Sequence, residues 1–151
     1  EIAKQKKNEL KTNGVYETIN ETSQKISKLS ELKFDFNNSS DIQLLTLLKP
    51  FKLPPLEKLR FSDLESLSTP SVFTNFLSSS ICQDSTSHIA QLSLTHQSSF
   101  SLTPYISSLT KVLPLVTQKV NLLYACLSRT EFEDILVASK NTQKISLSYC
   151  A

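Results

Sequence analysis

Glycine is almost absent from this chain. Gly14 is the only glycine among 151 residues, and the chain contains no methionine and no tryptophan. A single glycine cannot supply the glycine-rich loops whose backbone wraps around phosphate groups, so nothing indicates a nucleotide-binding enzyme of that type. Turns must instead be formed by Asn, Ser, Asp and Pro.

The chain also has little net charge and no long apolar run. Sixteen Lys and Arg residues against fourteen Asp and Glu residues leave a formal charge of +2. A charge this small does not indicate the basic surface that nucleic-acid binding requires. No apolar stretch approaches the roughly 18–20 residues that a membrane-spanning helix needs. We therefore expect neither a nucleic-acid partner nor a membrane span.

Few side chains are suited to metal binding or nucleophilic catalysis. Cys82, Cys126 and Cys150 include no CxxC pair, so neither a zinc site nor a disulfide framework is indicated. His88 and His96 are the only histidines, and no sequence feature brings either of them to Cys82 together with a third, orienting residue. We expect no enzymatic activity, no cofactor and no metal. Three reduced cysteines favour an intracellular location, in the cytoplasm or on the cytoskeleton.

A short strand-like phrase recurs five times in the chain. The copies are LSELKFDFN, LEKLRFSDL, IAQLSLTHQ, TQKVNLLYA and TQKISLSYC, which begin at Leu29, Leu56, Ile89, Thr117 and Thr142. Their fourth and sixth positions are apolar: Leu32 and Phe34, Leu59 and Phe61, Leu92 and Leu94, Val120 and Leu122, Ile145 and Leu147. The fourth positions lie 27, 33, 28 and 25 residues apart. A period of this size is typical of a repeat architecture.

A helix is predicted in every gap between these phrases. Apolar residues recur at helical spacing in each gap, behind residues that favour helix starts. The expected starts are Asp41, the pairs Thr69-Pro70 and Thr103-Pro104, and a capping box Thr130-x-x-Glu133. Strand and helix therefore alternate, which predicts an α/β fold with right-handed connections.

The phrase resembles the strand segment of the leucine-rich repeat, L-x-x-L-x-L-x-x-N/C-x-L. Asn37 and Cys150 match its ninth position, whereas Leu64, Gln97 and Ala125 depart from it. The spacing is most similar to the long, helix-containing class typified by ribonuclease inhibitor. The resemblance implies a solenoid of about five irregular repeats, a right-handed β-α superhelix with parallel strands on its concave face and helices on its convex face.

The resemblance covers residues 26–151, which we expect to be a piece of a longer array. Residues 1–25 are polar and rich in Lys, Glu, Asn and Gln. They are expected to form a helical N-terminal cap on the first repeat, because a terminal repeat needs a polar cover. An arm that docks on another chain is the alternative. Sequons begin at Asn20, Asn37 and Asn38, as arises by chance in a chain rich in Ser and Asn.

In the repeat geometry that the resemblance implies, the first, fourth, sixth and ninth positions point inward. The third, fifth, seventh and eighth positions then face the concave side. The residues predicted to contact a partner there are Tyr124, Tyr149, His96, Phe36, Arg60, Lys58, Lys119 and Lys144. Tyr124 and Tyr149 are the leading candidates, because tyrosine is enriched at interface hot spots. The basic residues favour a partner with an acidic patch.

The sequence thus predicts a non-catalytic protein–protein interaction module or scaffold, within a larger intracellular protein or assembly. Two alternatives remain at this point. The chain could be an architectural spacer in a large complex, whose helices and termini make the contacts. It could also regulate an enzyme, as do leucine-rich-repeat proteins that activate GTPases or inhibit hydrolases.

Overall fold

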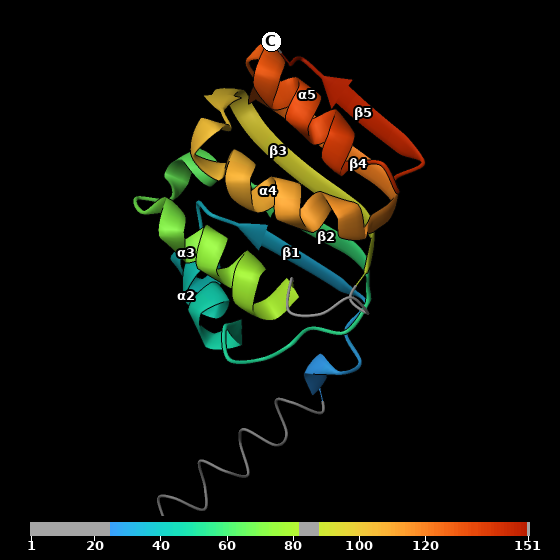
Figure 1. Cartoon of the computed structure of the whole chain (residues 1–151). Helices are drawn as coiled ribbons and strands as arrows, with labels where there is room; N and C mark the ends of the chain where they lie inside the picture. Colours follow the sequence, from blue (N-terminus) through green and yellow to red (C-terminus); the bar gives the residue numbers. More distant parts are fainter. Residues whose placement is uncertain (1–24, 82–87, 151) are drawn as a thin grey trace, which may run out of the picture.

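Five parallel strands form one sheet in this protein (Figure 1). The computed structural model describes residues 25–81 and 88–150. The strands are β1 (Glu31–Asp35), β2 (Leu56–Ser62), β3 (Ile89–Ser101), β4 (Val116–Cys126) and β5 (Lys144–Ser148). They lie in the sheet in the same order as in the chain. The predicted α/β class is confirmed, and residues 1–24 of the predicted N-terminal cap lie outside the described residues.

The register of the sheet follows the positions of the repeated phrase. Fourth positions pair with fourth positions along the sheet, as in Leu59 with Leu92. Sixth positions do the same, as in Phe61 with Leu94. The register shifts only within the β3–β4 pair, once between Ile89 and Gln91, where β4 carries one extra residue, and once between Thr95 and Phe100, where β3 carries the extra residues. Equivalent residues of the five copies therefore stand in columns across the sheet.

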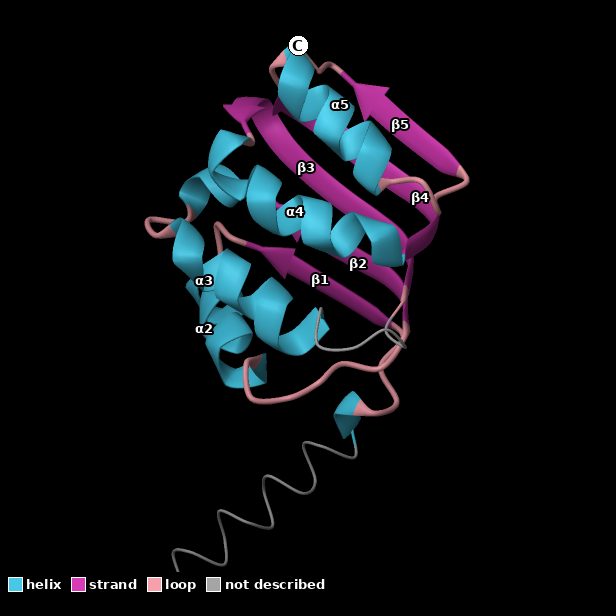
Figure 2. Ribbon diagram, viewed as in Figure 1, coloured by secondary structure: helices cyan, strands magenta, loops and turns pink. Residues whose placement is uncertain are grey.

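Helices connect the strands and cover one face of the sheet (Figure 2). The α-helices are α2 (Ser39–Leu48), α3 (Pro70–Phe76), α4 (Ile106–Val112) and α5 (Arg129–Ala138). Short 3-10 or π-helical turns occupy Leu64–Ser66, Leu77–Ile81, Thr103–Tyr105 and Leu113–Leu115. Among the residues that the structure describes, one α-helix lies in each gap between strands, which confirms the predicted alternation. The other face carries no helix among residues 25–81 and 88–150, and it is called the open face below.

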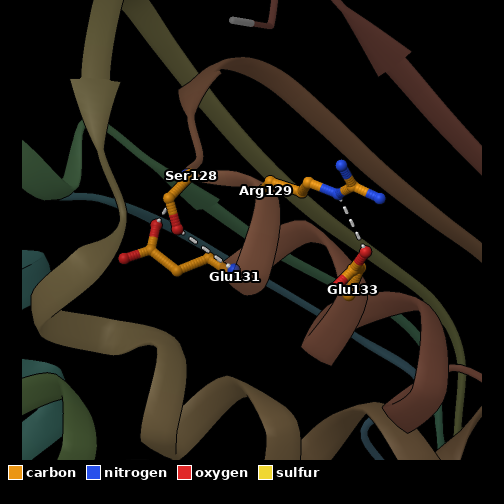
Figure 3. A network of polar contacts seen from close by, with 4 residues as sticks. All are labelled: Ser128, Arg129, Glu131 and Glu133. Carbon is orange, nitrogen blue, oxygen red and sulfur yellow. Dashed lines mark hydrogen bonds and ion pairs between the residues drawn. The ribbon is translucent and has the colours of Figure 1, made fainter.

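The helix starts differ in detail from the prediction. Helix α5 has a capping box, but it consists of Ser128 and Glu131 rather than the predicted Thr130 and Glu133 (Figure 3). The Glu131 amide donates to the Ser128 hydroxyl at 3.1 Å, and the Ser128 amide donates to the Glu131 carboxylate at 3.1 Å. Thr130 is already inside the first turn, because the extended cap residue is Ser128. Glu133 instead pairs with Arg129 at 3.2 Å.

The two threonine–proline pairs begin helical segments without acting as side-chain caps. Thr69 is the N-cap residue of α3 and Pro70 is its first helical residue, but the Thr69 side chain makes no capping hydrogen bond. Thr103 and Pro104 lie within a 3-10 turn that precedes α4. In α2 the cap is Asn38, whose side chain accepts from the Ser40 amide at 2.9 Å.

Aromatic rings fill the core between the sheet and the first two helices. Phe34 and Phe61, the sixth positions of β1 and β2, stack with ring centroids 5.5 Å apart. Phe73 and Phe76 of α3 approach Phe61 edge-on, at 4.7 Å and 6.3 Å. All four side chains are buried. Toward β4 and β5 the core becomes aliphatic, with Leu122 still buried. The inward direction of the sixth positions is thus confirmed up to β4.

Candidate functional site

The open face presents the third, fifth and seventh positions of the phrases. The third-position column is Glu31, Lys58, Gln91, Lys119 and Lys144, and the fifth is Lys33, Arg60, Ser93, Asn121 and Ser146. All of these residues are exposed or half-exposed. Neighbouring strands lie about 4.8 Å apart, so each column brings side chains from distant parts of the chain into contact range.

Basic residues dominate the charge of this face. Lys119 and Lys144 stand opposite each other in the β4–β5 register, and Lys33 stands opposite Arg60. Like charges directly opposite each other in a sheet are destabilising. Within the described part of the chain, neither Lys119 nor Lys144 forms an ion pair that would offset this cost. The basic columns therefore do not serve to stabilise the fold.

Acidic residues of these columns are confined to one edge. Glu31 and Asp35 both belong to β1, and the third, fifth and seventh positions of β2 to β5 include no Asp or Glu. Asp35 is further engaged in a local turn, where its carboxylate accepts from the Asn37 amide at 3.0 Å. From β2 onward the charged residues of these columns are all basic, and the other residues are polar except for the half-exposed Leu123.

Two tyrosines stack at the carboxyl ends of β4 and β5. The rings of Tyr124 and Tyr149 have centroids 5.0 Å apart and planes inclined by 13°. Tyr149 is 75% exposed, and Tyr124 is half-buried beneath it. The prediction that these two side chains are neighbours in the stack is confirmed. An exposed, pre-stacked aromatic pair offers a rigid apolar contact area beside a basic face.

The residue at the eighth position of the phrase has a left-handed backbone in three of the five copies and an ordinary backbone in the other two. Asp63, Tyr124 and Tyr149 have φ of 61°, 61° and 53°. These are left-handed values that cost energy in any residue with a Cβ, and bulky residues rarely adopt them. A left-handed residue breaks the alternation of the strand, so the next side chain turns inward. Leu64 and Ala125, which follow Asp63 and Tyr124, are accordingly buried.

The prediction that Phe36 and His96 lie exposed on the concave face is wrong. Their side chains are 1% and 3% exposed. Neither residue has a left-handed backbone, so the alternation of the strand continues and the eighth side chain points inward with the fourth and sixth. The ninth residues, Asn37 and Gln97, then point outward and are exposed, although they were also expected to point inward.

Both buried side chains belong to the core. The Phe36 ring lies 6.0 Å from that of Phe61. His96 packs on Phe100 at 4.9 Å, and its Nδ1 lies 3.1 Å from the Leu123 carbonyl oxygen. Its Nε2 has no hydrogen-bond partner among the described residues. A histidine enclosed in this way cannot contact a protein partner.

A polar network joins the turns after β1 and β2 to strand β3. The Asp63 carboxylate is buried, and it accepts from the side-chain amide of Asn37 at 2.6 Å and from that of Gln97 at 3.3 Å. Asn37 in turn accepts from the Ser66 hydroxyl at 2.5 Å. This network gives Asp63 a structural role, because its carboxylate is already satisfied by side chains from the two neighbouring repeats. Sequence reasoning missed it, since the three side chains come from three different repeats.

Histidine, cysteine and acidic side chains are the groups that could bind metal or act as nucleophiles in this chain. Residues 25–81 and 88–150 contain no cluster of three His, Cys, Asp or Glu side chains that could hold a metal ion. Cys126 and Cys150 are free and half-buried, and the Cys150 thiol donates to the Leu122 carbonyl at 3.5 Å. Cys82 lies outside the described residues. Burial raises the pKa of the Tyr105 hydroxyl above its ordinary value, which reflects a place in the core rather than a reactive group.

On the helical face, a broad groove lies between α4 and α5. Its volume is about 730 Å³, and its lining includes Ile106, Thr110, Asp134 and Val137. Its lining also includes Thr103 and Glu131, whose side chains hydrogen-bond to each other at 2.7 Å. The open face, with its charge columns and aromatic pair, remains the candidate site.

No helix in the described ranges has both the length and the apolar character needed to cross a membrane. Comparison of the chain with models of protein families, with curated proteins and with solved structures found no match. The functional argument therefore rests on the open face itself.

Proposed function

We propose that this chain is a leucine-rich-repeat solenoid that acts as a non-catalytic binding module and holds an acidic protein surface on its open face. The repeat assignment is supported by the sequential parallel strands, by one helix per gap and by the column register of the phrases. Repeat arrays of this kind expose a continuous row of strands, which commonly serves as a binding surface.

One observation supports the binding role above all others, namely the unbalanced charge of the open face. Lys58, Lys119 and Lys144 occupy one column, Arg60 stands in the next, and no acidic residue interrupts them from β2 to β5. Adjacent like charges cost stability, so their retention is better explained by a partner than by folding. An acidic partner surface would relieve this repulsion and would be steered toward the face at long range.

The tyrosine pair would add the apolar part of the contact. Tyr149 is largely exposed and is held against Tyr124, so little side-chain entropy remains to be lost when a partner covers it. We expect the partner segment to combine Asp or Glu side chains, which reach the basic columns, with an apolar side chain that packs on these rings. Phe36 and His96, being buried, take no part.

The test is a binding titration with defined peptides. A peptide of about twelve residues is long enough to cross the whole open face, because an extended segment of about six residues already spans the five strands. Glu-rich, Lys-rich and neutral peptides of this length, each with and without one Trp, would be titrated against the chain. We expect measurable binding only for the Glu-rich series, tighter with Trp, and weakening as salt rises.

Matched charge reversals locate the binding surface. Replacing Lys58, Arg60, Lys119 and Lys144 with Glu is expected to weaken binding of the Glu-rich peptide at least about tenfold. The control reverses the same number and type of charges away from the open face, at Lys49, Lys111, Arg129 and Lys140, which are all exposed. Equal losses in the two variants would show that net charge alone drives binding, and the proposal would then fail.

The aromatic contribution needs variants that preserve the backbone. Asn tolerates a left-handed φ, so Tyr149→Asn removes the ring without adding strain. Tyr149→Phe keeps the stack on Tyr124. We expect the Trp-containing peptide to lose its advantage with Tyr149→Asn and to keep it with Tyr149→Phe. If Trp increases the affinity of the peptide equally for both variants and for the unsubstituted chain, the apolar contact lies elsewhere.

A further inference from the structure

The cations of the open face are divided unevenly among the strands. Lys58 and Arg60 occupy the third and fifth positions of β2, and they are called the first basic site. Lys119 and Lys144 stand opposite each other at the third positions of β4 and β5, and they are called the second basic site. The strand between the two sites is uncharged at its third, fifth and seventh positions, which are Gln91, Ser93 and Thr95.

The side chains of both basic sites are available to a partner. Each of the four is exposed or half-exposed. In the part of the chain that the structure describes, none of them forms an ion pair or a side-chain hydrogen bond. The hydroxyls of Ser62 and Thr95, by contrast, lie 3.1 Å apart and satisfy each other. An acidic partner therefore gains most of its polar contacts at the two basic sites and little at the seventh positions of β2 and β3.

The arrangement of the cations favours a partner segment that crosses the strands. A segment that follows one strand meets at most the two cations of β2, whereas a segment that crosses from β2 to β5 meets both basic sites. Neighbouring strands lie about 4.8 Å apart, so the centre of the second site is about 12 Å from β2. These side chains project from the face of the sheet rather than from its edges, so a strand paired to either edge would leave them in place.

Strand β1 limits the acidic contact on one side. Its third, fifth and seventh positions are Glu31, Lys33 and Asp35, two acidic residues and one basic residue. Glu31 stands directly opposite Lys58 in the β1–β2 register. An acidic segment that continued over β1 would meet Glu31 and be repelled. The acidic part of the partner is therefore expected to cover β2 to β5 only.

Building on the binding role proposed above, we propose that the partner segment crosses β2 to β5 and presents two acidic groups about 12 Å apart, with an uncharged stretch between them. In an extended chain this distance corresponds to about four residues. Two linked contacts reinforce each other only when the connection between them matches the distance between their sites. The neutral strand β3 thus makes the open face selective for the spacing of acidic residues as well as for their number.

Peptides that act as molecular rulers test the spacing. Two Glu-Glu pairs joined by no, two or six prolines have the same charge, and a polyproline spacer extends about 3.1 Å per residue. The centres of the pairs then lie about 6, 12 and 25 Å apart. In fluorescence anisotropy titrations of the whole chain at low salt, we expect the two-proline peptide to bind about threefold to tenfold more tightly than the others.

The results of the ruler series separate the spacing from the binding role. Equal affinities for the three peptides would overturn the spacing and leave the acidic-surface role intact. The same conclusion would follow if none of the three bound while the Glu-rich peptide of about twelve residues did. If that peptide also failed to bind, both proposals would be overturned.

Moving one cation within the third-position column provides the matched variant. Gln91→Lys combined with Lys144→Gln keeps the net charge and shifts the second site to β3 and β4, about 7 Å from β2. We expect this variant to prefer the peptide without prolines. The control moves one lysine on the helical face by combining Ser107→Lys with Lys111→Ser, both exposed positions of α4, and should keep the original preference. An unchanged preference in the first variant, or the same shift in the control, would contradict the proposal.

Discussion

Replacing Phe61 with alanine is expected to lower the free energy of unfolding by about 3–5 kcal/mol. Phe61 is 1% exposed and stands at the centre of the aromatic core. Its ring centroid lies 5.5 Å from that of Phe34, 6.0 Å from Phe36, 4.7 Å from Phe73 and 6.3 Å from Phe76. The cavity would border two strands and one helix, so no single element can move to close it.

Part of this cost comes from ring–ring contacts rather than from burial alone. Phe73 meets Phe61 edge-on, with planes inclined by 87°. Such pairs contribute about 0.5–1.5 kcal/mol beyond the area they bury. A double-mutant cycle with Phe61→Leu and Phe73→Leu should recover a coupling energy of this size.

Urea denaturation followed by far-ultraviolet circular dichroism measures the change. With a slope of about 2 kcal/mol per molar urea, a loss of about 4 kcal/mol lowers the midpoint by about 2 M. Leu47→Ala is the control, because Leu47 is 67% exposed and its truncation should change stability by no more than about 0.5 kcal/mol. A loss below about 1 kcal/mol for Phe61→Ala, at an unchanged slope, would refute the view that these rings hold the first repeats together.

Three further predictions concern local features. Ser128→Ala should lower the free energy of unfolding by about 1 kcal/mol in the same urea assay, since the Glu131 amide loses its acceptor; Thr130→Ala, inside the helix, should have little effect. Tyr149→Gly should be more stable than Tyr149→Ala by about 1 kcal/mol, because φ is 53° there; equal stabilities would contradict the left-handed backbone. The pKa of Tyr105 is raised in the folded state, because burial disfavours the charged phenolate. The contribution of its neutral hydroxyl to stability is therefore present below pH about 10 and is lost as pH rises further. The urea midpoint of Tyr105→Phe should consequently fall less from pH about 9 to about 11 than that of the unsubstituted chain.

The spacing of apolar residues was sufficient to predict the strands and the register. Alternation along a strand is a local property, so Leu59 and Phe61 identify the same inward face in any sheet that contains them. Every copy of the phrase has apolar residues at its fourth and sixth positions. A register that pairs equivalent positions therefore places these apolar residues on the same buried face of the sheet. The sequence therefore predicted that Leu59 would stand beside Leu92, and the structure confirms it.

The start of α5 illustrates where a local pattern is ambiguous. Ser128-x-x-Glu131 and Thr130-x-x-Glu133 both satisfy the capping-box pattern, two residues apart. The choice between them depends on where β4 ends, at Cys126, and on the helix phase that buries Ile135. Neither constraint can be read from the four-residue pattern, because both arise from packing against the preceding unit.

The sequence by itself determined the alternation of strand and helix, the inward columns at the fourth and sixth positions and the charge of the open face. Tertiary structure decided at which residue the regular strand backbone ends, and therefore whether the eighth side chain is buried or exposed. A left-handed residue at Tyr124 sends Ala125 inward and keeps the tyrosine at the surface, whereas the unbroken strand at His96 buries the histidine. Whether the eighth residue adopts a left-handed backbone depends on the cost of backbone strain and on the energy gained by burying either the eighth or the ninth side chain. That energy depends on neighbouring side chains from other repeats, so it cannot be predicted from the sequence of one phrase.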